Sequence, residues 1–315
     1  MIIYDSKKWN SLFTTLFKTY KYSYNMRQLL RFIFYTTLYA ISATLLNMHY
    51  LADLYQIDTD FFSLIGVILS LFLVFRLNSG YYRWWEGRKA WGALVNDSRS
   101  LSLKLDSIIP IEDMNKRRYF GRHISNFCMS LVLHLRDSTD LNKYHLEKSD
   151  KADEIAEFKH HPNKFGSKLF RELEAMHKNN NISDFDKYFC NKLVQRFIDT
   201  LGTCERIKKT PIPFSHSTFI KLFIVIYIII LPFGLANVFG YLTIPAVMVM
   251  AFAMIGIEVI SEEIENPFGT DANDLPIGFI TDTITENVFE VLGIDHEIGY
   301  TAKKYSLAEE AEIIH

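Results

Sequence analysis

The stretch EVISEEIENPFGTDANDLP, from Glu258 to Pro276, contains six carboxylates and no Lys or Arg. Carboxylate and carbonyl oxygens on a shaped turn are the ligands that calcium prefers. An EF-hand loop starting at Asp271 would need Gly at its sixth position and Glu at its twelfth. The chain has Pro276 and Asp282 there, which excludes an EF-hand and leaves only a looser calcium site.

The same turn has a structural interpretation that requires no ion. Pro267 and Gly269 are typical of a helix end, because Pro lacks a backbone donor and Gly tolerates the conformations that stop a helix. Asp271 or Asp274 would then cap the helix that follows. The residue types are compatible with both interpretations, so the turn is a candidate site for either role.

Three of the acids share one helix face, since Glu258, Glu262 and Glu265 are spaced i, i+4 and i+7. In a pore-forming assembly this face would place acidic rings near a vestibule and favour cations. At an ordinary helix end the same residues would be solvated charge. No Lys or Arg occurs between Leu222 and Ala302, so we expect any basic partner to come from the N-terminal segment.

The remaining chemistry-bearing residues give weaker signals. His160 and His161 are adjacent, and we expect a solvated pair rather than two ligands of one metal, with His123 and His134 packed or on the surface. The three cysteines show no paired spacing, which argues against disulfides or a cysteine zinc site. The chain has no Walker A, GxGxxG, HExxH or GxSxG motif, so we expect no enzymatic activity. Its net charge of −2 argues against nucleic acid as a partner.

The elements that position these residues include apolar blocks long enough to cross a bilayer. The blocks run from Leu29 to Leu51, from Phe61 to Phe75 and from Phe219 to Ile260. The third is uncharged from Leu222 to Ile257, too long for one span, and its Gly and Pro residues predict a hairpin of two helices. We therefore expect four transmembrane helices.

The second block is short for a lipid-facing span, because Arg76 ends it. At 1.5 Å per residue it makes roughly 22 Å of helix, against a hydrocarbon core of about 30 Å. Arg76 would either snorkel to the interface or lie on a helix that faces a water-filled path. One stripe of this helix is apolar at i, i+4 and i+8, a pattern typical of packing or lipid contact: Val67, Leu71 and Phe75.

Basic residues predict the orientation of these spans. Lys and Arg precede the first and third blocks and follow the second, whereas the loop NMHYLADLYQIDTD has none. The positive-inside rule therefore places both termini and the middle of the chain in the cytoplasm. That middle part shows helical spacing of apolar residues, and no β alternation is sustained, so the fold class is all-α.

We divide the chain into five regions. They are a cytosolic or interfacial N-terminal segment (1–28), transmembrane helices 1 and 2 (29–83), a cytosolic helical region (84–218), a transmembrane hairpin of helices 3 and 4 (219–260) and a cytosolic C-terminal segment with the acidic turn (261–315).

Four motifs, in this order, resemble the bacterial branch of the bestrophin family: FRLNSGYYRWWEGRKAWGALVNDSRSL, CERIKKTPIPFSHS, LPFGL and IENPFGTDANDLP. The similarity extends from about Asn25 to Gly293. It implies a homopentameric ion channel of the inner (plasma) membrane, with the pore on the fivefold axis. The implied partners are the lipid bilayer, further copies of this chain and permeant ions such as chloride or sodium, with no required cofactor.

The resemblance also implies roles for particular residues. In the family the second span lines the pore, and three apolar residues form a narrow neck, which correspond here to Val67, Leu71 and Phe75. The family favours chloride or other anions, and phenyl edges attract anions weakly. A sodium-selective channel of the same architecture is the alternative, and a secondary transporter is a less favoured one because no inverted repeat is visible.

Animal members of the family carry a calcium clasp after the same Asn-Pro-Phe-Gly motif. The correspondence implies Asp271 and Asp274 as carboxylate ligands and Asn266 as a backbone ligand. The dense acidic run of the family is thinned here, because three acidic positions are replaced by Thr270, Ala272 and Asn273. Calcium is therefore a candidate ligand of this turn, with fewer carboxylates than the animal clasp.

Overall fold

A computed structural model describes residues 24–51, 59–146, 157–271 and 273–294 of the 315-residue chain. Within these ranges the regular elements are all helical, which confirms the all-α prediction. The expected interfacial N-terminal segment (1–28) falls mostly outside the described residues, as does the C-terminal segment beyond residue 294.

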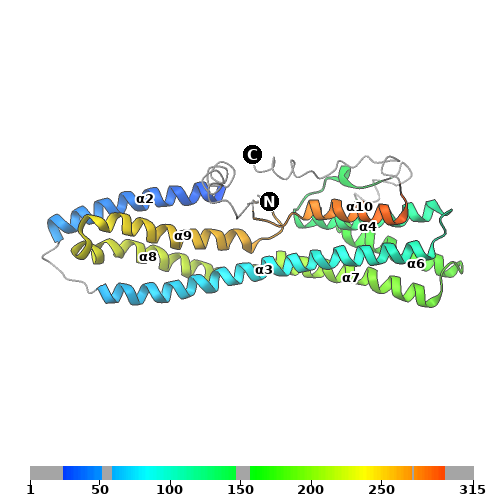
Figure 1. Cartoon of the computed structure of the whole chain (residues 1–315), viewed down its shortest axis with the longest axis horizontal. Coiled ribbons are helices and arrows are strands. Elements are labelled where there is room, and N and C mark those ends of the chain that lie inside the picture. Colours follow the sequence, from blue (N-terminus) through cyan, green and yellow to red (C-terminus); the bar gives the residue numbers. More distant parts are fainter. Residues whose placement is uncertain (1–23, 52–58, 147–156, 272, 295–315) are drawn as a thin grey trace.

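The molecule is an elongated bundle with two halves (Figure 1). In one half, α2 (Tyr24–Leu46), α8 (Phe214–Phe239) and α9 (Thr243–Glu265) lie beside the first part of α3 (Thr59–Ile108). In the other half, the rest of α3 lies beside four further helices: α4 (Met114–Leu135), α6 (His161–Lys178), α7 (Asp184–Lys209) and α10 (Ile277–Leu292). Three short elements complete the description: η1 (Asn47–Leu51), η2 (Leu141–Lys143) and η3 (Gly240–Leu242).

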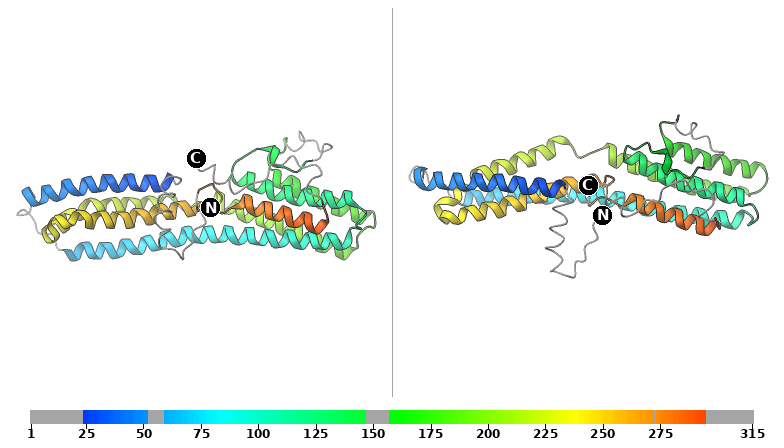
Figure 2. Two further views of the ribbon diagram at one scale, coloured as in Figure 1. Left: turned by 45° about the horizontal axis from the view of Figure 1, so that its top comes forward. Right: turned by 90° about the horizontal axis from the view of Figure 1, so that it is seen from above.

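Helix α3 is 50 residues long and joins the two halves without a break (Figure 2). It therefore crosses the boundary that the sequence placed between residues 83 and 84. Past the apolar block α3 packs closely on α9: a Cβ on Gly80 would lie 2.8 Å from the carbonyl oxygen of Ser261 on α9. Only glycine allows the two helices to approach this closely.

Among the described residues, three segments are long and apolar enough to cross a membrane: Asn25–Tyr50, Asp60–Ile108 and Phe214–Glu265. The last of these is folded into two helices, α8 and α9, which are connected by η3 and pack against each other. Gly240 starts the connection with a φ of 54°, a conformation that favours glycine. The structure thus bears out the hairpin that the Gly and Pro residues predicted.

Each half has its own apolar core. In the membrane half the core side chains come from α2, α3, α8 and α9, and include Ala40, Leu69, Tyr227 and Val247. In the other half they come from α3, α4, α6, α7 and α10, and include Trp91, Phe127, Phe197 and Phe289. Helices with charged outer faces around an aromatic core are typical of a water-exposed bundle. The second half therefore provides a rigid base for the end of the membrane half.

Candidate pore face and the acidic turn

Helix α3 presents the three residues of the predicted neck away from the bundle. Val67 is 68% exposed, Leu71 54% and Phe75 55% in the single chain. Two residues along an α-helix rotate the side chain by about 200°, so Leu71 points opposite to Leu69 and Leu73. The side of α3 that packs against the bundle is buried at these positions: Phe62, Leu69, Leu73 and Arg76.

The uncovered side of α3 is not uniformly apolar. Ser63, Ser70 and Asn78 are also exposed on this half of the helix. The Ser70 hydroxyl donates a hydrogen bond to the Gly66 carbonyl, 2.7 Å away, so its polarity is partly satisfied within the helix. Polar side chains in membrane helices usually face a bundle interior or water rather than hydrocarbon. This face therefore has the mixed character of a pore or subunit surface.

Arg76 does not lie at a lipid interface or on the uncovered face. Its side chain is 1% exposed inside the bundle, where Nη2 lies 2.8 Å from Glu265 Oε2 and Nε lies 3.5 Å from Glu258 Oε1. Nη2 also donates to the Ser217 hydroxyl at 3.5 Å. The snorkelling interpretation of Arg76 is therefore wrong, because the side chain is buried and paired with two carboxylates within the fold. The other interpretation, that the helix carrying Arg76 faces a water-filled path, stays a prediction.

The three glutamates of α9 are placed by the same contacts. Glu258 and Glu265 point to Arg76, and Glu265 Oε1 also accepts a hydrogen bond from the backbone N–H of Ile212 at 3.0 Å. Glu262 is exposed and pairs with Lys221, with 2.8 Å between Oε2 and Nζ. Among the described residues the basic partners therefore come from α3 and α8. The basic N-terminal segment, which the sequence suggested as a partner, lies mostly outside the described residues.

A second arginine on α3 connects the acidic turn to the base. Arg83 Nε donates to the backbone carbonyl of Glu265, at the last residue of α9. Its two terminal nitrogens donate to the carbonyls of Thr210 and Ile207, at the end of α7. A guanidinium at the ends of two helices satisfies carbonyls that have no helical partner and complements the helix dipoles. Arg83 thus holds the end of α9 in a defined position.

The acidic turn closes on itself through Asp274. Its Oδ2 accepts the backbone N–H of Asp271 at 2.7 Å, and the Asp274 N–H donates to the Asp271 carbonyl at 3.1 Å. A Cβ on Gly269 would lie 2.6 Å from the same Oδ2, so glycine is needed for this approach. The expectation that Asp271 or Asp274 caps the next helix is wrong: α10 begins after Pro276 without a side-chain cap.

Asp274 is buried at 4% exposure, and its Oδ1 has no hydrogen-bond partner. Burial raises the pKa of this carboxyl to about 7, although the Asp271 N–H opposes the shift. A cavity of about 10 Å³, roughly the size of one water, lies beside it and is also lined by Arg136.

The residues around this cavity bear on the calcium clasp that the resemblance implies. Calcium takes six to eight oxygen ligands. Both implied carboxylates, Asp271 and Asp274, line the cavity, with Asp274 buried and Asp271 exposed, and Asn266 is exposed as well. The guanidinium of Arg136 lines the same space and opposes a second cation. The hydrogen bonds between Asp271 and Asp274 agree with the helix-ending turn that Pro267 and Gly269 predicted.

The structure also brings together residues that the sequence analysis treated separately. His134, at the end of α4, and His160, just before α6, both contact Glu205 of α7. The three residues are far apart in the chain, 71 positions from His134 to Glu205 and 45 from His160 to Glu205. No spacing rule could have detected the group, although Glu205 belongs to the CERI motif.

The fold and the uncovered α3 face define an all-helical membrane protein with a second, water-exposed helical half. Comparison with known proteins specifies the family: the model of the bacterial and fungal bestrophin proteins matches residues 2–290. The chain therefore belongs to the bestrophin family, as the four motifs predicted.

Relatives and solved structures agree with this assignment. The voltage-dependent anion channel-forming protein sll1024 of Synechocystis is 35% identical over 243 residues, covering 75% of this chain and 78% of the relative. The voltage-dependent anion channel-forming protein YneE of Escherichia coli K12 is 30% identical, and the match covers 73% of this chain and 75% of the relative. A crystal structure of a bestrophin homolog from Klebsiella pneumoniae superposes with a TM-score of 0.80 at 26% identity, covering 84% of this chain and 99% of that one.

Proposed function

We propose that five copies of this chain form a channel for small inorganic anions in the inner membrane, with α3 lining the pore. Val67, Leu71 and Phe75 form its hydrophobic neck, and α2, α3, α8 and α9 cross the bilayer with both termini in the cytoplasm. The observation that carries this proposal is the apolar stripe on α3, whose three side chains are each more than half exposed in the single chain.

The neck works by controlling water. Five copies of each side chain around an axis make stacked apolar rings, which exclude water when narrow and admit hydrated ions when slightly wider. The Phe75 ring adds a weak preference for anions, because phenyl edges carry partial positive charge. The packed face of α3, anchored by Arg76, keeps the neck residues at a defined rotation about the helix axis.

The anion preference has two further supports. The relatives are named as anion channel-forming proteins. The three glutamates that would favour cations at a vestibule each have a basic partner, Arg76 for Glu258 and Glu265 and Lys221 for Glu262. Their negative charge is therefore largely compensated where an acidic ring would act.

A reversal-potential measurement tests the proposal. Purified protein in a planar bilayer, with different NaCl concentrations on the two sides, should give currents that reverse near the chloride equilibrium potential. Reversal near the sodium potential would replace the anion proposal with the cation-selective alternative. Slow saturating flux that needs a second substrate, without unitary currents, would indicate a secondary transporter instead. The mass of the detergent-solubilised particle should correspond to five chains.

A further inference from the structure

Two histidine side chains, one from the end of α4 and one from the start of α6, contact the same carboxylate oxygen on α7. Glu205 Oε1 lies 2.6 Å from His134 Nε2 and 3.0 Å from His160 Nε2. The two imidazole rings are 4.6 Å apart between centroids. One ligand atom from each residue falls within 4.8 Å of the others. Such convergence of three side chains from different helices requires the tertiary fold to hold it.

The donor types are those of an open transition-metal site. Two imidazole nitrogens and one glutamate oxygen form a three-ligand set that zinc uses when a fourth position is left for water. With zinc–nitrogen bonds of about 2.0–2.1 Å, neighbouring ligand atoms lie about 3.3 Å apart. The present separations of Glu205 Oε1 from the two imidazole nitrogens are shorter, 2.6 Å for His134 and 3.0 Å for His160, so metal binding requires the side chains to move outward by less than about 1 Å.

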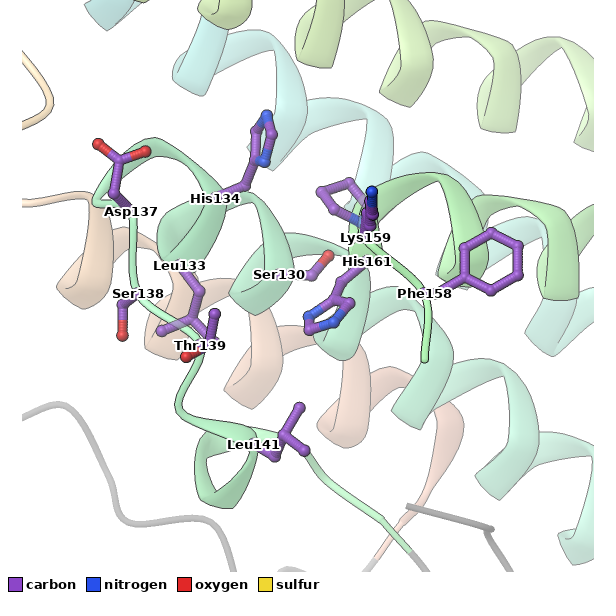
Figure 3. A pocket seen from close by; sticks show the side chains of 11 residues that line it. Ser130, Leu133, His134, Asp137, Ser138, Thr139, Leu141, Phe158, Lys159 and His161 are labelled. Carbon is purple, nitrogen blue, oxygen red and sulfur yellow. The ribbon is translucent and has the colours of Figure 1, made fainter. Parts of the chain in front are cut away.

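A fourth ligand could reach the group from solvent. The three side chains are partly exposed, at 25% for His134, 29% for His160 and 23% for Glu205. His134 also lines a cleft of about 620 Å³ in the base. Figure 3 shows His134 at one side of this cleft, opposite His161 and Lys159. His160 and Glu205 do not line this cleft, so the partial exposure of the three side chains is what leaves a position for water.

Two contacts compete with a metal. Lys209 Nζ lies 3.2 Å from Glu205 Oε1, but this lysine is 64% exposed and can turn to solvent. His160 Nδ1 accepts the backbone N–H of Asn163 at 3.3 Å, and binding through Nε2 would place a proton on Nδ1 instead. That capping bond is long, so its loss is a small cost beside two metal–ligand bonds.

From this geometry we propose that His134, His160 and Glu205 bind a divalent transition metal of the zinc class. The metal joins the end of α4, the segment that begins α6 and the last turns of α7 into one unit. It acts as a clamp in the base and takes no part in the α3 pore face. Hard cations such as calcium are not expected here, because two of the three ligands are imidazoles.

Zinc titration of the full-length protein, with any histidine tag removed, tests this site. Calorimetry in detergent should show one zinc per chain, and zinc should raise the thermal unfolding midpoint. His160→Ala and Glu205→Gln should each weaken zinc binding at least about tenfold, since each removes a ligand. His177→Ala is the matched control, because His177 is a partly exposed histidine of the same helical half that pairs with Asp184 and lies outside the three-residue group. It should leave zinc binding unchanged.

Cobalt gives a second readout that does not depend on stability. Substituted into the wild type, Co²⁺ should show the intense visible absorption of a four-coordinate site, and this band should be absent in both ligand variants. Equal zinc affinity in the wild type, His160→Ala and Glu205→Gln would overturn the proposal in favour of scattered surface sites. No zinc binding by the folded wild type would overturn it in favour of a hydrogen-bond network alone.

Discussion

Arg76 Nη2 and Glu265 Oε2 form an ion pair 2.8 Å long inside the helix bundle, with the Arg76 side chain 1% exposed. This pair joins the middle of α3 to the last residue of α9. Glu258 provides a second, longer contact to the same guanidinium. The pair therefore connects the helix that carries the predicted neck with the helix that leads into the acidic turn.

We expect Arg76→Leu to lower the free energy of unfolding by about 3–5 kcal/mol, because it leaves two carboxylates without their buried cation. Thermal unfolding in detergent measures this change. Lys221→Ala is the control, since its pair with Glu262 is 43% and 60% exposed and should contribute less than about 1 kcal/mol. If both variants unfold like the wild type, the buried pair has no structural role.

Widening the neck should change conduction. We expect Val67→Ala, Leu71→Ala and Phe75→Ala together to raise unitary conductance or relax ion selectivity, because smaller rings exclude less water. Single-channel recording measures both quantities. Val225→Ala with Ile229→Ala on α8 gives a control of similar chemistry, since these side chains are also about half exposed. Unchanged currents in the triple variant would remove the neck assignment.

The turn should be sensitive to a single methyl group. We expect Gly269→Ala to reduce stability by about 1–3 kcal/mol, because its Cβ would lie 2.6 Å from Asp274 Oδ2. Gly202→Ala is the matched control in helix α7, where a Cβ meets nothing within 4 Å. It should stabilise by about 0.5–1 kcal/mol. Equal effects in both variants would contradict the close approach at the turn.

Asp274 should make stability depend on pH. Its pKa rises from an ordinary 3.8 to about 7 on folding, so the folded state keeps the proton that the unfolded state loses. The free energy of unfolding should therefore fall between about pH 4 and pH 7, on the order of a few kcal/mol. Asp274→Asn removes this contribution, and its difference from the wild type should grow over that interval. A constant difference would show that the carboxyl is ionised throughout.

Calcium gives a separate test of the turn. Because two carboxylates and the Arg136 side chain line a cavity of about 10 Å³, fewer oxygens than the six to eight that calcium takes, we expect the wild type and an Asp271→Asn, Asp274→Asn double variant to give the same calorimetric response to millimolar calcium. A heat present only in the wild type would establish the clasp that the family resemblance implies.

Much of the architecture could be read from the sequence, because it depends on local properties. Apolar length marked the candidate spans, and the Gly and Pro residues near Gly240 indicated the hairpin of α8 and α9. The stripe of Val67, Leu71 and Phe75 follows from helical periodicity alone. The four motifs were sufficient for the family. None of these inferences depends on which helices pack against each other.

The roles of the charged residues could not be read in the same way. At the level of sequence Arg76 interrupts an apolar span, because the carboxylates that neutralise it are 182 or more positions away in the chain. The acids of the turn looked alike, yet the fold buries Asp274 and leaves Asp271 exposed.

Sequence by itself determined the helices, their membrane character and the stripe on α3, since backbone periodicity and apolar length act over neighbouring residues. Only the tertiary structure decided that Arg76 is neutralised inside the bundle and that His134, His160 and Glu205 meet. The physical reason is that charge compensation and ligand convergence act over a few ångströms in space, which the packing of distant helices sets.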